Sequence, residues 1–418
     1  MEIIMTHKKK LTAYKTATVI LALSLILSLI ACALLLAKTN RPVNAPSTDT
    51  VRVPTVSNMP EATEKLTEEE STVPETTVDE QSRRIEELEA LVDKYAQSAS
   101  AGFGFQADRF SELLKIVTDE DRPLRSHVND EGEPTGEKTP AKVAFCYTDL
   151  TTGYTFSYNG DEIMYSASLI KLPYVYAVLS EVEKFEYNKR NFDIEGNPLF
   201  DENGEPLFEG DHPNLDADGN IIYLEGEEKY DLSREWVYYS SSMFEEGSGE
   251  IQHEKDGFTL TYLDLICYAV KYSDNIAFKA LRSTFGFDTH NAMLEELDIA
   301  GREKGFMQLS AKDCAKYLKL VYEYCESDSP YAKALKEALL TATYTPMIPD
   351  ALSPIVCGHK YGWDVGAYHD MAIAYDERPF SLVIMTDLDS GSYKDYMYIQ
   401  SIAKVILELH QGYNTAEA

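Results

Sequence analysis

The sequence feature that most restricts the fold is the order of predicted strands and helices after residue 105. Two strands are predicted at 142–147 and 154–158, joined by a Thr-Gly turn typical of a hairpin. Further strands are predicted near the C-terminus, at 355–360, 371–375 and 380–386. Strands at both ends with helices between them favour an α+β domain. In such a domain the N- and C-terminal strands share one antiparallel sheet, which packs with an all-helical subdomain.

The helical subdomain is predicted between the two groups of strands. One helix covers about 168–184, and a polar insertion follows at about 185–228. Two more helices begin at Thr261 and Ser310, where an aspartate three residues later completes a capping box. Flanking helices are predicted at 106–117, which is amphipathic, and at 393–410.

An apolar segment without charges precedes this domain. Residues 16–37 are long enough for a transmembrane helix, and four lysines between residues 8 and 15 place residues 1–15 in the cytoplasm. A second interpretation is a lipobox ending at Cys32, which would then carry the lipid. We favour the uncleaved helix, because the apolar run continues through Leu36. Both interpretations predict a single-pass or lipid tether to the cell membrane, with the domain outside the cell.

Two segments connect this tether to the domain at 105–418. Residues 38–77 are rich in Pro, Thr and Glu and have no apolar period, which predicts a disordered extracellular stalk. Within 78–104, apolar residues recur at heptad-compatible spacing. This pattern predicts either a short coiled coil, giving a weak dimer through residues 78–97, or a lone amphipathic helix.

The composition restricts the partners of the chain. A net charge of −32 argues against nucleic acid, whose phosphates attract Lys and Arg. The cysteines outside the apolar segment show neither a CxxC pair nor a metal-binding spacing, so we predict no metal and no cofactor. We expect them to be buried as small apolar side chains: Cys146, Cys267, Cys314, Cys325 and Cys357.

The segment Ser168-Leu169-Ile170-Lys171 carries the predicted chemistry. On a helix, positions three apart share a face, so the Lys171 amine lies beside the Ser168 hydroxyl. A lysine desolvated at a buried helix start can have its pKa lowered enough to take a proton from that hydroxyl. The helix start also offers backbone N–H groups to a developing oxyanion. Alone, this spacing is usually a solvated helix face, but here it follows a hairpin and precedes an apolar run.

Two further short segments follow the same order along the chain. Ser273-Asp274-Asn275 ends an apolar helix, where a polar turn is the ordinary interpretation. Lys360-Tyr361-Gly362 lies on a predicted strand, where an edge lysine beside a closely packed glycine is the ordinary interpretation. With Ser168–Lys171 and the stretch EGSGEIQ at 246–252, they resemble the serine β-lactamase and penicillin-binding-protein superfamily. The class A β-lactamase branch is the most similar, and the resemblance covers about 105–412.

The resemblance implies roles for the catalytic residues. Ser168 is the nucleophile that forms an acyl-enzyme, and Lys171 takes its proton. Ser273 relays a proton toward the leaving group, and Asn275 orients Lys171 and binds the substrate.

The resemblance also implies a substrate-binding strand. Lys360 attracts the substrate carboxylate and keeps the Lys171 pKa low, and Gly362 lets the substrate approach. The backbone N–H groups of Ser168 and Trp363 form the oxyanion hole.

Two departures from the family pattern affect the expected activity. Tyr361 stands where the family has Thr or Ser. The E-x-x-x-N loop, whose glutamate activates the deacylating water in class A enzymes, has no counterpart between Asn275 and Ser310; Glu303 is the only acid in the remnant of that loop. We therefore expect slow deacylation of β-lactams. The alternatives are a cell-wall D,D-peptidase acting on D-Ala-D-Ala stem peptides, and a non-enzymatic penicillin-binding receptor or scaffold.

The insertion at 185–228 contains an acidic segment, 214–225, with the ligand spacing of an EF-hand loop. No helix pattern precedes it, so a Gly-turned acidic loop is the preferred interpretation over a calcium site. Because the insertion lies between the Ser168 helix and Ser273, we expect it near the rim of the site.

Overall fold

The structure is a computed structural model that describes residues 107–128, 134–192, 199, 214–216, 218–299, 301, 305–389 and 391–416. Most of them belong to one compact unit, Asp108–Gln411. The predicted cytoplasmic segment, transmembrane helix, stalk and coiled coil, which together span residues 1–104, lie outside the described residues. Among the residues that are described, no helix has both the length and the apolar character that a membrane span requires.

The core of the unit is a five-stranded antiparallel sheet with the strand order β4-β3-β11-β10-β9. Its strands are β3 (Val143–Asp149), β4 (Thr155–Tyr158), β9 (Cys357–Asp364), β10 (Ala367–Ala374) and β11 (Phe380–Thr386). The N-terminal hairpin joins the C-terminal strands where β3 pairs with β11, all seven residues of each strand being buried. The predicted α+β fold, with both ends of the domain in one sheet, is confirmed.

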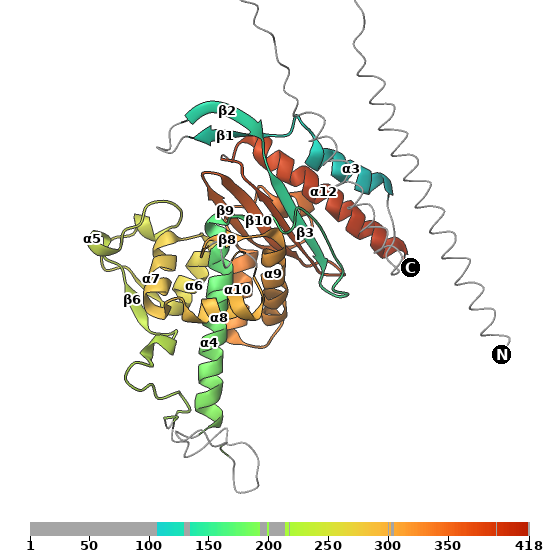
Figure 1. Cartoon of the computed structure of the whole chain (residues 1–418). Helices are drawn as coiled ribbons and strands as arrows, with labels where there is room; N and C mark the ends of the chain where they lie inside the picture. The colour runs from blue at the N-terminus through green and yellow to red at the C-terminus, as the bar shows by residue number, and fades with distance from the viewer. Residues whose placement is uncertain are drawn as a thin grey trace, which may run out of the picture. The chain divides into compact units, whose positions relative to one another are not determined.

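Helices cover both faces of this sheet (Figure 1). On one face lie α3 (Ala107–Thr118) and α12 (Tyr393–Ala416), which are joined where the Tyr398 hydroxyl donates to the Ile116 carbonyl. The Tyr147 hydroxyl of β3 bonds His410 of α12 at 2.7 Å. On the other face α9 contacts β3, β10 and β11.

The helical part lies between β4 and β9 in the sequence. Its helices are α4 (Lys171–Asn191), α5 (Ser240–Met243), α6 (Tyr262–Lys271), α7 (Asn275–Phe285), α8 (Asp288–Glu296), α9 (Ala311–Cys325), α10 (Pro330–Leu340) and α11 (Ile348–Leu352), with 3-10 turns η1 (Ala167–Ile170), η2 (Glu228–Tyr230) and η3 (Ile251–His253). The capping boxes predicted at Thr261 and Ser310 are both confirmed. Four of the five predicted buried cysteines are buried, and Cys267 is half-buried.

The helix predicted at 168–184 differs from the observed one at both ends. It begins as the 3-10 turn η1, and the α-helix runs from Lys171 to Asn191, seven residues into the predicted insertion. Tertiary contacts explain this extension: the Phe185 ring stacks on Tyr230 at 4.2 Å, and Lys189 pairs with Glu227 at 2.7 Å.

The described part of the insertion is not where the sequence suggested. Its described part packs on the C-terminal end of α4, where Asn214 donates to the Phe192 carbonyl and Arg190 to the Gly219 carbonyl. A 21-residue helix is about 30 Å long, so this end is remote from Lys171 at the other. The expectation that these residues lie near the rim of the site is wrong, because the helix continues away from the sheet before the chain turns.

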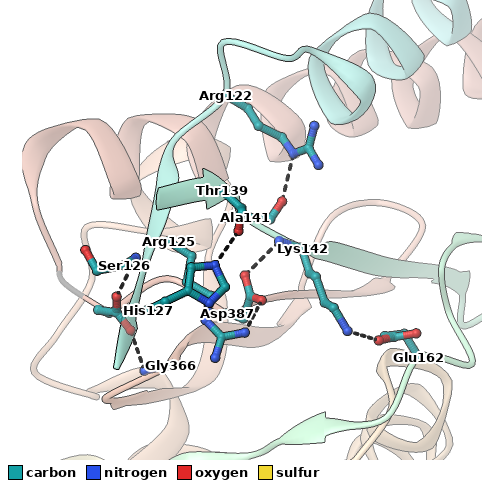
Figure 2. A network of polar contacts seen from close by, with 11 residues as sticks. Arg122, Arg125, Ser126, His127, Thr139, Ala141, Lys142, Glu162, Gly366 and Asp387 are labelled. Carbon is teal, nitrogen blue, oxygen red and sulfur yellow. Dashed lines mark hydrogen bonds and ion pairs between the residues drawn. The ribbon is translucent and has the colours of Figure 1, made fainter. Parts of the chain in front are cut away.

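A hairpin that the sequence analysis missed stands beside the sheet. It pairs β1 (Leu124–Val128) with β2 (Pro134–Pro140). Figure 2 shows how polar groups hold it, among them Arg125 and Asp387. These two pair at 3.0 Å, and Asp389 accepts from the Ser126 and Gly366 backbones. Two shorter sheets pair β5 (Met164–Tyr165) with β8 (Gln308–Leu309) and β6 (Glu235–Val237) with β7 (Thr259–Thr261).

Candidate active site

Ser168 lies in a turn held firmly from both sides. The preceding Ser166 donates its backbone N–H to the Met307 carbonyl at 2.8 Å, and Ala167 adopts a left-handed φ of 45°. Leu169 and Ile170 are fully buried, whereas Ser168 is partly exposed. The residues on both sides of Ser168 are therefore buried, while Ser168 itself is half-buried.

Lys171 is buried with its amine among polar acceptors. The side chain is 3% exposed, and Nζ donates to Oδ1 of Asn275 at 2.7 Å and to the Ser273 carbonyl. Burial lowers the pKa of Lys171 to about 7; Asp274 opposes this shift and Arg282 adds to it. A neutral amine has two N–H donors, which these acceptors use, and one lone pair, which is left to take a proton. Lys171 is thus suited to act as a base near neutral pH.

Ser273, Asp274 and Asn275 form the connection between α6 and α7. Ser273 is fully buried with a φ of 53°, a left-handed conformation that turns the chain sharply. Asp274 caps α7 by accepting from Ala277 N at 2.9 Å, and it also accepts from Ile251 N. This capping fixes the residue on each side of Asp274.

The stretch 246–252 contacts these residues. The Ser248 hydroxyl donates to the Ser273 carbonyl at 2.7 Å, and Asn275 Nδ2 donates to the Glu246 carbonyl at 3.0 Å. Gly247 has a φ of 121°, and a Cβ there would lie 2.5 Å from Asn275 Nδ2. Both Asn275 amide atoms are therefore held, one by Lys171 and one by this stretch.

Strand β9 contributes Lys360 to the same cluster. Lys360 is fully buried, and its Nζ donates to Oγ of Ser273 at 2.9 Å and to the Tyr361 carbonyl at 2.6 Å. Burial holds the pKa of Lys360 well below its usual value, and the neighbouring Lys171 lowers it further. The Ser273 hydroxyl thus lies between two amines, 3.4 Å from Lys171 Nζ and 2.9 Å from Lys360 Nζ.

Gly362 lets β9 pack against the Ser168 turn. A Cβ at this position would lie 2.7 Å from the Ser166 carbonyl and 3.1 Å from Leu169 N. No residue larger than glycine fits there without a shift of the backbone. The next residue, Trp363, is 47% exposed. The strand at 362–363 therefore lies directly beside the turn that carries Ser168.

Two side chains near Lys171 were not anticipated. Lys171 Nζ lies 5.8 Å from the centre of the Phe278 ring, and Arg282 stacks on that ring at 4.9 Å. They follow Asn275 at i+3 and i+7 on α7, so helical periodicity placed them on the same face. Glu303, the one acid considered as a deacylating base, lies outside the described residues.

The described residues contain no cluster of three or more His, Cys, Asp or Glu side chains that could hold a metal ion. In the acidic loop, the Asp216 carboxylate accepts from the backbone N–H groups of Asp218 and Asn220 and from the Asn220 side chain. These hydrogen bonds join residues 216–220 to one another and form a turn. They are in keeping with the interpretation of this segment as an acidic turn.

The fold and this cluster define a class of protein: a serine β-lactamase or penicillin-binding-protein-like member, with a serine at a helix start, a buried lysine one turn on, and a second serine–lysine pair across from them. The model of the β-lactamase enzyme family matches residues 124–191 and 224–409. The chain belongs to this family.

Solved structures share the fold at low sequence identity. A β-lactamase from Sphaerobacter thermophilus is 17% identical with a TM-score of 0.51, covering 74% of this chain and 99% of its own. A β-lactamase from Chitinophaga pinensis is 14% identical with a TM-score of 0.52, covering 72% and 99%. A PBP-A variant in an acyl-enzyme complex with penicillin G is 13% identical with a TM-score of 0.51, covering 73% and 97%. Among curated proteins, no sequence matches the chain significantly.

Proposed function

We propose that this protein is a serine hydrolase that forms an acyl-enzyme on Ser168, with β-lactams or D-Ala-D-Ala-type peptides as acyl donors. One observation carries the proposal: a buried lysine with a pKa of about 7 lies one helical turn after a partly exposed serine. A serine hydroxyl needs such a base to become a nucleophile. The acyl-enzyme of the similar PBP-A variant with penicillin G is in keeping with this reaction.

In the proposed reaction, each residue of the cluster has one task. Lys171 accepts the Ser168 proton as Ser168 attacks the carbonyl, and Asn275 orients Lys171 through its 2.7 Å bond. Ser273, bonded to Lys360, passes a proton to the leaving group. The N–H groups of Ser168 and Trp363 stabilise the oxyanion.

We further propose that the acyl-enzyme with β-lactams is released slowly. Deacylation needs a base that activates water, and beyond its polar acceptors the Lys171 amine has an aromatic ring as neighbour. Phe278 lies beside Lys171, and Phe306 stacks on Phe278 at 6.4 Å. Asp274 is the nearby carboxylate that acts most strongly on Lys171, but it already accepts from two backbone N–H groups.

Stopped-flow hydrolysis of a chromogenic cephalosporin by the full chain tests this function. Loss of one general base costs a factor of about 10²–10⁴, so the acyl-enzyme accumulates. We expect a burst of about one equivalent, followed by slow steady turnover. Steady turnover above about 10 s⁻¹ without a burst, a common enzyme rate, would contradict slow release.

We also propose that residues 16–37 anchor the chain in the cell membrane and that residues 38–104 hold the domain outside the cell. The uncharged run of residues 16–37 and the lysines before it support this proposal. Protease added to intact cells should then cut the domain from the membrane. A domain that stays protected until the cells are lysed would contradict the orientation.

A further inference from the structure

Lys360 is closed off from any ligand in this structure. Its side chain is fully buried, and two of its N–H donors bond Oγ of Ser273 and the Tyr361 carbonyl. The ring of Tyr361 lies 4.2 Å from Lys360 Nζ. An ammonium that is to hold a substrate carboxylate must present a free donor to it. Lys360 therefore bonds Ser273 rather than a ligand, and its remaining donor, fully buried beside the Tyr361 ring, is not exposed to a ligand carboxylate.

Other aromatic rings hold Tyr361 in place. Tyr361 packs against Tyr344 with ring centres 4.8 Å apart, and the Tyr344 hydroxyl bonds that of Tyr368 at 2.9 Å. The Trp363 ring lies 5.8 Å from Tyr344 and 5.9 Å from Tyr368. We call these four residues the aromatic wall. Moving Tyr361 would break its packing against Tyr344, which Tyr368 and Trp363 hold in turn.

The wall stands beside the Ser168 turn, and Trp363 is its exposed member. Tyr361 and Trp363 flank Gly362, whose Cα packs against the Ser168 turn, and Trp363 is 47% exposed. Asp364, the next residue, is exposed and bonds the Tyr165 hydroxyl at 2.9 Å. This edge of β9 thus offers aromatic surface and one negative charge to a ligand.

Resting on the proposed acyl transfer to Ser168, we propose that the aromatic wall selects acyl donors whose leaving group is uncharged, aromatic esters above all. Ser168 Oγ bonds the carbonyl carbon, the ester C–O bond breaks, and the Ser168 proton passes through Lys171 and Ser273 to the departing oxygen. Water then cleaves the acyl-enzyme, so that ester and water give a carboxylic acid and a phenol. In a β-lactam the part that holds the leaving nitrogen carries a carboxylate. We therefore expect β-lactams to acylate Ser168 more slowly than neutral esters of equal reactivity.

A matched pair of esters tests the selectivity. Phenylacetate esters of 3-hydroxybenzamide and of 3-hydroxybenzoate differ in one charge on the leaving group. The kcat/KM of the full chain for each is divided by the rate of its hydroxide-catalysed hydrolysis, which removes the difference in leaving-group acidity. We expect the neutral ester to be favoured at least tenfold.

Three variants connect the preference to the ring. Tyr361→Thr should lower the ratio at least tenfold, because it removes the wall and opens Lys360. Tyr361→Phe should keep the ratio, and so should the control Tyr187→Thr, since Tyr187 is 61% exposed near the far end of α4. A ratio that a folded Tyr361→Thr variant leaves unchanged would overturn the inference. If that variant does not fold, the wild-type ratio decides alone.

The outcomes separate this inference from the proposed function. Hydrolysis of both esters with equal or better use of the carboxylate would contradict the selectivity and leave the acyl-enzyme on Ser168 standing. Hydrolysis of neither ester, with no acyl adduct on Ser168, would contradict the proposed function and the selectivity with it.

Discussion

At the scale of single residues, the site depends on burial more than on ion pairs. The pKa of Lys171 is lowered mainly because burial desolvates the amine, and the charge of Arg282 on α7 lowers it further. Asp274 works against both, but backbone N–H groups share its carboxylate. A lysine in this setting is a base at neutral pH without a histidine or a metal ion.

The pH dependence of acylation tests the role of Lys171. Its pKa is lowered to about 7, so the proton-free form that can act as a base appears as pH rises through that value. The acylation rate should therefore rise between about pH 6 and 8 and then level off. Lys171→Ala should slow acylation by a factor on the order of 10² and remove this inflection.

Arg282→Gln provides a second variant for the same measurement. Because the Arg282 charge lowers the pKa of Lys171, its removal should move the inflection to higher pH. Lys319→Gln, an exposed lysine on α9, serves as the control. A flat profile in the wild type, or the same inflection in Lys171→Ala, would show that another group takes the proton.

At the scale of elements, the close contact between β9 and the Ser168 turn is the critical packing. Gly362→Ala places a methyl group 2.7 Å from the Ser166 carbonyl, so the strand and the turn must separate by a few tenths of an ångström. The proposed oxyanion N–H groups of Ser168 and Trp363 lie on the two sides of this contact. We expect acylation to slow at least tenfold, since small misplacements are costly in catalysis.

Gly358→Ala on the same strand is the matched control for that variant. Its added methyl group would lie 3.2 Å from Leu339 Cβ, tight as well but away from Ser168. It should lower stability and leave the acylation rate of the folded protein unchanged. Equal acylation rates for Gly362→Ala and wild type, followed by the intact mass of the acyl adduct, would mean that this contact does not position the oxyanion hole.

Local patterns in the sequence predicted the strands of the main sheet and the capped helices, because each is encoded within a few residues, as at Thr261 and Ser310. They did not predict the end of α4, which Tyr230 and Glu227 stabilise from outside the helix. The sequence did not predict the aromatic wall for the same reason. Tyr344 and Tyr368 come from different segments of the chain and lie near Tyr361 only in the folded structure.

At the scale of the whole molecule, buried histidines make the domain sensitive to acid. Burial lowers the pKa of His290 and of His369 to about 4. The unfolded chain therefore binds more protons than the folded one between about pH 6.5 and 4, and stability falls as pH falls through that range. Over that pH range each histidine lowers the free energy of unfolding by on the order of 3 kcal/mol. The two losses together approach the usual stability of a domain.

His290→Phe should weaken this acid sensitivity. Within the described residues neither ring nitrogen of His290 has a hydrogen-bond partner, and its ring packs against Tyr174 and Phe306. Between pH 7 and 5, urea unfolding should show the variant losing about 2 kcal/mol less stability than the wild type. His253→Gln, an exposed site, should behave as the wild type. Identical losses in all three proteins would mean that His290 is protonated in the folded state.

The intact mass of the protein after incubation with an acylating compound shows whether an acyl-enzyme forms on Ser168. The full chain is incubated with penicillin G or a fluorophosphonate probe, beside Ser168→Ala and the control Ser240→Ala. We predict one added acyl or phosphonyl mass on the wild type and on Ser240→Ala, with the modified peptide containing Ser168, and none on a folded Ser168→Ala. An unmodified wild type, or undiminished labelling of Ser168→Ala, would contradict the account.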